Sequence, residues 1–175
     1  MSILNILTYP DPFLRTKAKP VEDVNDSVRR LIENMVETIY FVKGVGLAST
    51  QVGDERRIIV LDVPNGDEYK SGKNLLTLIN PDIIEHEGET SFEEGCLSIP
   101  GITAEVKRSA SIALKALNID GKDLEISAEG LLAIVIQHEI DHLDGILFID
   151  RLSRIKREII KRKIKKALED ERKRL

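Results

Sequence analysis

The chain has little of what disulfide-bonded or membrane-embedded proteins are built from. Its 175 residues include one cysteine, so no internal disulfide can form and a disulfide scaffold is excluded. No apolar run approaches the roughly 20 residues that a bilayer-spanning helix needs. The first residues also lack the basic and apolar segments of a secretion signal. We therefore expect a cytoplasmic protein, suited to a reducing compartment, that has no membrane partner.

Internal repeats and low-complexity stretches are missing as well, and 42% hydrophobic content is enough for the core of one domain over residues 1–175. Charge is unevenly distributed. Residues 151–175 hold 12 Lys/Arg against 4 Asp/Glu, whereas the other 150 residues hold 14 against 26. In the basic segment the apolar residues recur at helical spacing, at Leu152, Ile155, Ile159, Ile164 and Leu168. The pattern predicts a basic amphipathic C-terminal helix on an acidic body.

The rest of the chain alternates between helical and strand-like patterns. A helix capped by Asn25 or Asp26 is expected to end at Gly44, and a second helix over 129–144 to end at Gly145. Between them, strands are predicted over 57–63, 75–80, 103–106 and 111–117, with a hairpin turn over 118–121. This order predicts an α+β fold, with antiparallel β-sheets around a central helix, an N-terminal helix and a C-terminal basic helix.

Histidine is scarce, yet two of the three lie four residues apart in the central helix. His138 and His142 would stack on one helical face, close enough to share a metal ion. Glu139 sits beside them, where a carboxylate can handle the proton of a water molecule. The spacing is typical of a hydrolytic metal site.

Two ligands leave a catalytic metal site incomplete, because such sites usually take three protein ligands. In familiar zinc proteases with this motif the third ligand lies downstream, but Phe148 occupies the corresponding position and no histidine follows it. Upstream, His86 is interpreted as a solvated residue at a strand end. Cys96 follows Gly95, which lets the backbone bend around a site, and its thiolate suits iron or zinc. Cys96 is therefore the better candidate.

Three segments, 44–51, 94–98 and 137–142, resemble in order and separation the signature motifs of the bacterial peptide deformylases. The match covers nearly the whole chain, with Ser49 where alanine is common. The resemblance implies removal of the formyl group from the N-terminal formylmethionine of new polypeptides, with release of formate. N-formylmethionyl peptides and nascent chains would then be its partners.

The resemblance also implies a role for each motif residue. One divalent metal ion would be held by Cys96, His138 and His142. Iron(II) is the expected physiological ion, which zinc, nickel or cobalt could replace. Glu139 would transfer protons, while the Gln51 side-chain amide and the Leu97 backbone N–H would donate to the carbonyl oxygen as it gains charge.

The substrate pocket can be placed from the helix. Residues one and two turns before His138 project from the same side, and they are predicted, with two loops, to bind the substrate. The predicted substrate-binding residues are Gly44, Val45, Gly46, Glu94, Leu131, Ile134 and Val135. Asp141 is interpreted as a carboxylate on the helix surface or behind the ligands, without a catalytic role.

Two other functions remain open on the residues alone. One is a metallopeptidase of the His-Glu-x-x-His type, which the missing downstream ligand disfavours. The other is a metal-stabilised RNA-binding module, for which Glu139 would be unnecessary. The cationic C-terminal helix adds a further hypothesis, that the protein docks on ribosomal RNA near the nascent chain.

Overall fold

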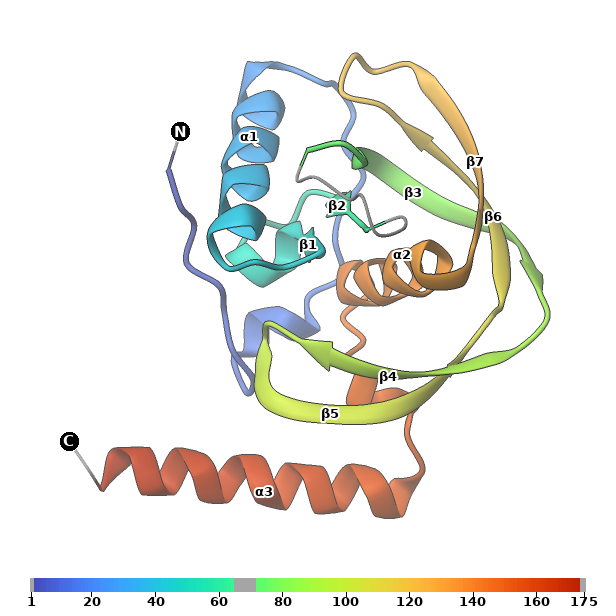
Figure 1. The fold of residues 1–175 in the computed structure, drawn as a ribbon. Helices are drawn as coiled ribbons and strands as arrows, with labels where there is room; N and C mark the ends of the chain where they lie inside the picture. The colour runs from blue at the N-terminus through green and yellow to red at the C-terminus, as the bar shows by residue number, and fades with distance from the viewer. Residues whose placement is uncertain (1, 65–71, 174–175) are drawn as a thin grey trace.

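The computed structural model describes residues 2–64 and 72–173. Its helices and strands follow one another along the chain as shown in Figure 1. They are the 3₁₀ turn η1 (Pro12–Arg15), α1 (Asp26–Phe41), β1 (Gly46–Ala48), the 3₁₀ turn η2 (Ser49–Val52), β2 (Ile58–Asp62), β3 (Leu75–Glu87), β4 (Thr90–Cys96), β5 (Ile99–Arg108), β6 (Ser111–Leu117), β7 (Asp123–Glu129), α2 (Gly130–Leu143), the 3₁₀ turn η3 (Phe148–Arg151) and α3 (Arg154–Arg172).

Within the described residues, the strands form two antiparallel sheets. One has the order β1-β2-β3-β6-β7, and the other is the pair β4-β5. Helix α2 lies between them, with α1 against β1 and β2 and α3 running alongside β5 (Figure 1). The predicted α+β fold around a central helix is therefore confirmed.

Helix α1 forms where its cap and its apolar spacing predict. The Asn25 side chain accepts hydrogen bonds from the backbone N–H groups of Ser27 and Val28, which satisfies donors at the helix start. The helix ends at Phe41, and the Gly44 N–H then bonds to the Ile39 carbonyl. Its buried face packs on β1, β2 and β3. The helix contributes Leu31, Ile32, Met35 and Ile39, and the strands contribute Leu47, Ile58, Val60 and Ile79.

Helix α2 is buried along most of its length, which explains why its sequence is apolar beyond a single stripe. Ala133, Ile136 and Ile140 pack on the five-stranded sheet, against residues of β2, β3 and β6. The helix stops at Gly145, which has a φ of 72° and whose N–H bonds to the His142 carbonyl. A Cβ at this glycine would lie 2.5 Å from the carbonyl oxygen of Arg15, so the tight approach of the N-terminal arm requires glycine.

The strands differ from the prediction in extent and number. The segments 75–80 and 103–106 lengthen into β3 and β5, while β1, β4 and β7 were not predicted at all. Strand β7 has three exposed carboxylates, and β4 contains Glu93, Glu94 and Gly95; these residue types have low intrinsic strand preference, which cross-strand pairing overrides. The hairpin turn between β6 and β7 is confirmed, with the Asn118 side chain accepting from the N–H groups of Asp120 and Lys122.

Helix α3 is confirmed, but its apolar stripe is only partly covered. Ile160 is buried and Ile164 is half-buried against the cluster around Phe148, whereas Ile155 and Ile159 remain 75% and 48% exposed. Much of the helix therefore stands free of the body. None of the described helices is both long and apolar enough to cross a membrane.

Candidate active site

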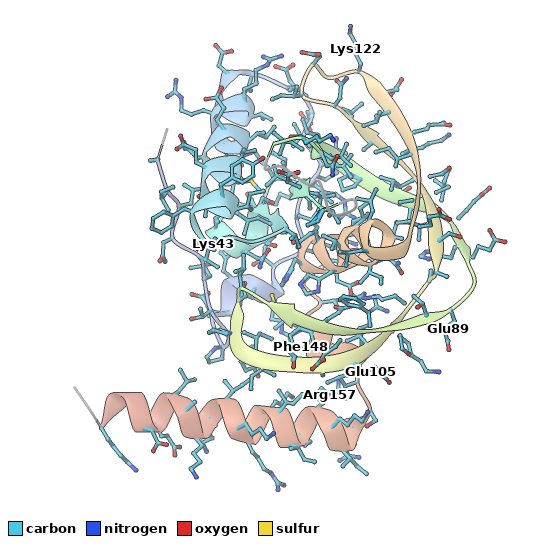
Figure 2. The ribbon with its side chains drawn as sticks, viewed as in Figure 1. Lys43, Glu89, Glu105, Lys122, Phe148 and Arg157 are labelled. Carbon is cyan, nitrogen blue, oxygen red and sulfur yellow. The ribbon has the colours of Figure 1, made fainter. Side chains whose placement is uncertain are left out.

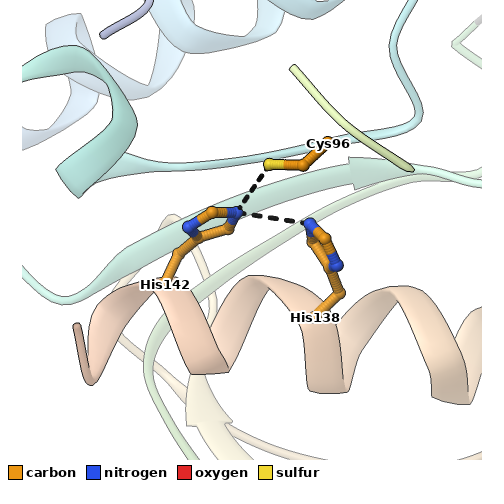
Figure 3. A group of neighbouring side chains, drawn as sticks. All are labelled: Cys96, His138 and His142. Atoms are coloured by element: carbon orange, nitrogen blue, oxygen red, sulfur yellow. Dashed lines mark hydrogen bonds between the residues drawn. The ribbon is translucent and has the colours of Figure 1, made fainter. Parts of the chain in front are cut away.

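Three side chains from two separate elements meet at one point (Figure 3). Cys96 ends β4, and His138 and His142 lie one turn apart on α2. The His142 Nε2 atom lies 3.1 Å from Cys96 Sγ and 3.2 Å from His138 Nε2, and the three ligand atoms all lie within 4.8 Å of one another. The structure thus brings together the three predicted metal ligands.

The donor set fits a single metal ion. Metal–ligand bonds of about 2.0–2.3 Å place two ligands of one ion roughly 3–4 Å apart, as these atoms are. The His138 Nδ1 atom lies 2.8 Å from a Glu94 oxygen, to which it donates its proton, and Nε2 is the ring nitrogen that faces the ligand group. A thiolate and two imidazoles suit zinc and iron(II) alike.

The pKa values of the two histidines are shifted in opposite directions. Burial by itself lowers the pKa of His138, but hydrogen bonds with Cys96 and Glu94 raise it well above its usual value. Burial and the neighbouring charge of His138 lower the pKa of His142 well below its usual value. The Thr50 hydroxyl holds this residue from behind by donating to the His142 carbonyl at 3.0 Å.

Glu94 has partners that the sequence did not predict. We expected it to bind substrate, but both of its oxygens accept from Arg108, at 2.7 and 2.9 Å, and one also accepts from His138. Burial raises the pKa of Glu94, but the bonds from Arg108 and His138 outweigh it and lower that pKa to about 2. The carboxylate therefore stays charged and orients a ligand histidine, although it also lines the pocket wall.

Arg108 connects this carboxylate to α2. Its remaining nitrogen donates to Asp141 at 2.5 Å, and Asp141 also accepts from Arg151. Asp141 is buried, so the expectation of a helix-surface position is wrong and the position behind the ligands is confirmed. Arg108 was not predicted as a site residue, because it belongs to no recognised motif. Its role follows only from its buried hydrogen bonds, two to Glu94 and one to Asp141.

Glu139 points into the site from the residue next to His138. Its side chain is buried and its Oε2 atom has no hydrogen-bond partner among the described residues. Burial raises the pKa of Glu139 to about 7, against the opposing charge of His138. A carboxyl group held in this way can exchange a proton near neutral pH.

Gly46 leaves the space that this carboxylate occupies. A Cβ at Gly46 would lie 2.6 Å from Glu139 Oε1, too close for any real contact. Gly46 was predicted to leave its backbone free to pair with a peptide. The structure adds a second reason for glycine here, because any side chain would collide with the Glu139 carboxylate.

Replacing Gly46 with alanine is therefore expected to displace the Glu139 carboxylate and to lower kcat for the reaction inferred below by about 100-fold, as misplacement by about 1 Å can. Gly44→Ala is the comparison variant, because its Cβ would contact Leu97 at 3.1 Å, Val42 at 3.6 Å and the Gly46 carbonyl at 3.8 Å but not Glu139, so any effect on peptide pairing should raise KM and leave kcat unchanged. Steady-state kinetics and metal content of both variants check the prediction. A Gly46→Ala enzyme with unchanged kcat would contradict it.

Gln51 lies beside the ligands with its amide orientation set by its neighbours. Its Oε1 accepts from the Ala48 N–H at 2.9 Å, which turns Nε2 toward Ser98 Oγ at 3.1 Å and Cys96 Sγ at 3.7 Å. Leu97, the next residue after Cys96, lines the same cavity. The predicted donors therefore lie next to the ligand group.

The cavity that contains these groups has a volume of about 500 Å³. It brings together every predicted substrate-binding residue, namely Gly44, Val45, Gly46, Glu94, Leu131, Ile134 and Val135. Lys43, Phe92, Pro100 and Gly101 also line it and were not predicted. His86 lies elsewhere, exposed on β3 and bonded to Ser109, as a solvated strand-end residue should.

Comparison with known proteins agrees with this geometry. The family model described as "Polypeptide deformylase" matches residues 3–158. Proteins named peptide deformylase from Syntrophobacter fumaroxidans and Thermodesulfovibrio yellowstonii are 50% and 48% identical, over 97% and 94% of this chain and 98% of each relative.

Solved structures extend the likeness to the fold. A peptide deformylase from Legionella pneumophila superposes with a TM-score of 0.87 at 44% identity, covering 97% of both chains. The Ehrlichia chaffeensis enzyme in complex with actinonin has a TM-score of 0.87 at 40% identity, covering 95% of this chain and 98% of that one. With its three motifs assembled around one ligand group, this chain belongs to the polypeptide deformylase family.

Proposed function

We infer that this protein hydrolyses the bond between the N-formyl group and the terminal methionine of nascent polypeptides, releasing formate and a free amine. One observation carries the inference: the ligand atoms of Cys96, His138 and His142 lie within 4.8 Å of one another, at a largely apolar cavity that Cys96, His138, Glu139 and Gln51 line. We treat residues 1–175 as a single catalytic domain that ends in the basic helix α3.

The ligand group would hold one divalent metal ion, and we propose iron(II), with zinc, nickel or cobalt able to replace it. When bound, the ion supplies Lewis-acid polarisation of the formyl carbonyl and acidifies water. Glu94, held by Arg108, keeps the His138 ring in the tautomer and orientation that a ligand needs.

Glu139 acts as the proton carrier. Its carboxylate takes a proton from the attacking water and delivers it to the departing amine, for which its buried position and its unpaired Oε2 are suited. The Gln51 amide and the Leu97 N–H donate hydrogen bonds to the carbonyl oxygen as negative charge develops on it.

The apolar wall of the cavity selects the methionine side chain. Leu131, Ile134 and Val135 form it from α2, and Val45 adds a wall from the loop before β1. Gly44 and Gly46 leave their backbone open to pair with an extended peptide.

The test is a formate-release assay on formyl-Met-Ala with anaerobically prepared protein, together with metal analysis. We expect formate and an iron content near one per chain. The matched peptide without the formyl group, Met-Ala, identifies a metallopeptidase, which would cleave the Met–Ala bond and release no formate from formyl-Met-Ala. That result would overturn the proposal.

We further propose that the protein works in the cytoplasm, close to the ribosome, and that α3 helps it to dock there. Support comes from the 12 Lys/Arg of residues 151–175 and from the exposure of Arg162 and Lys166 on this helix. Phosphate contacts by such cations release counterions, so binding should weaken as salt rises.

Replacing Arg162 and Lys166 together with glutamate is expected to weaken binding to purified ribosomes at low salt by about 10-fold or more. The control pair is Lys17→Glu with Lys122→Glu, which changes net charge equally at exposed positions outside α3. Lys122 lies at the β6–β7 turn, at the opposite end of the molecule (Figure 2). Equal binding of the two double variants in sedimentation experiments would refute a specific role of α3.

A further inference from the structure

A second cavity adjoins the methionine pocket. It has a volume of about 700 Å³ and lies between α3, the start of β5 and the N-terminal arm. We call it the α3–β5 groove, and it is lined by Thr8, Tyr9, Ile99, Pro100, Gly101, Ile102, Lys163, Ile164, Ala167, Leu168 and Asp170. Pro100 and Gly101 line both cavities, so the two adjoin at the first residues of β5.

Little side-chain bulk separates the two cavities where they adjoin. Pro100 and Gly101 are both exposed. Gly101 has a φ of 74°, and a Cβ built there would meet no heavy atom within 4 Å. A chain that leaves the methionine pocket at this point therefore meets no side chain at Gly101 that would turn it away from the groove.

The chemistry of the groove suits an uncharged, apolar occupant. Ile102, Ile164 and Leu168 are only half-buried, so their apolar surface remains open to a ligand. Lys163 and Asp170 carry opposite charges at its edge, which leaves no excess of either sign. The excess of cations on α3 lies instead at positions outside this lining, such as Arg162 and Lys166.

We propose that the α3–β5 groove binds the downstream part of the substrate, an extended polypeptide segment with apolar side chains whose formylated end occupies the methionine pocket. This inference rests on the proposed function. The part of α3 that lines the groove, residues 163–170, is about 12 Å long, which is the span of about four residues of an extended peptide.

The experiment compares three formylated peptides without ribosomes. One is formyl-Met-Ala-Ser, and the other two extend it to ten residues, either with alternating leucine and serine or with glycine and serine alone. For the wild-type enzyme we expect KM for the leucine-containing peptide to be about 10-fold lower than for the glycine-serine peptide, with similar kcat. That ratio corresponds to about 1.4 kcal/mol of binding free energy.

Ala167→Trp fills the groove from an exposed helix position, and it should abolish this difference while leaving the kinetics of formyl-Met-Ala-Ser unchanged. Lys166→Trp places the same side chain at the next residue, outside the groove lining, and should preserve the difference. Circular dichroism verifies that α3 is intact, and Ala167→Glu is a second variant at the same position.

Two results would overturn the groove proposal. One is an equal KM for both long peptides with the wild-type enzyme, and the other is a difference that survives in both Ala167 variants. Failure of the proposed function looks different, because no formate would then be released from formyl-Met-Ala-Ser by any of the proteins.

Discussion

Replacing Glu139 with glutamine is expected to lower kcat for formate release by about 1,000-fold, because general acid–base groups typically contribute about 100- to 10,000-fold. The amide keeps the size and the buried position of the side chain but can no longer accept a proton from water. Metal content should stay the same, since Glu139 is not among the ligand atoms that meet at Cys96, His138 and His142.

The thermal midpoint of this variant should not fall. The Glu139 Oε2 atom is buried and has no hydrogen-bond partner among the described residues, so the native carboxyl adds little stability. Glu129→Gln, an exposed change at the start of the same helix, is the matched control and should retain full activity. If Glu139→Gln kept more than a tenth of the wild-type kcat, the proton-transfer role assigned to Glu139 would be wrong.

Replacing Arg108 with methionine is expected to cost about 3–5 kcal/mol of unfolding free energy, the usual cost of breaking a buried ion pair by removing one partner. The change removes the arginine from the buried Glu94 carboxylate and leaves the buried Asp141 carboxylate with Arg151 as its one remaining cation among the described residues. Denaturant unfolding of the metal-free protein measures this cost. Lys107→Met on the same strand is the control and should change stability little, because its ion pair with Glu89 is solvent-exposed (Figure 2).

The same variant should bind metal about 10- to 100-fold more weakly, the usual effect of losing a group that orients a ligand. Without Arg108, Glu94 is no longer held in both of its hydrogen bonds, and the His138 ring loses its fixed orientation. Competition with a chelator measures this loss independently of activity. Arg108→Lys keeps the charge without the two-pronged contact, and we expect an intermediate effect. Wild-type stability and metal affinity in Arg108→Met would contradict the role assigned to the network.

Local patterns predicted the helices better than the strands. The start of α1 follows from one capping side chain and a repeated apolar spacing, both contained within a single helix. Strands β4 and β7 depend on partners elsewhere in the chain, and their Glu, Asp, Ser and Gly residues have low intrinsic strand preference. Helix α3 was predicted from its apolar spacing, but the spacing did not predict which of these apolar residues are buried. The rest of the protein covers only some of them.

The sequence by itself determined the reaction centre. Helical geometry alone places His138 and His142 one turn apart with Glu139 beside them, and the likeness to deformylase motifs added Cys96, Gln51 and Leu97. Only the tertiary structure decided what surrounds that centre. It placed Arg108 between two buried carboxylates, Glu139 against Gly46, and α3 across a groove from the first residues of β5. The physical reason is that these contacts join residues from separate elements, brought together by burial and strand pairing that no local spacing records.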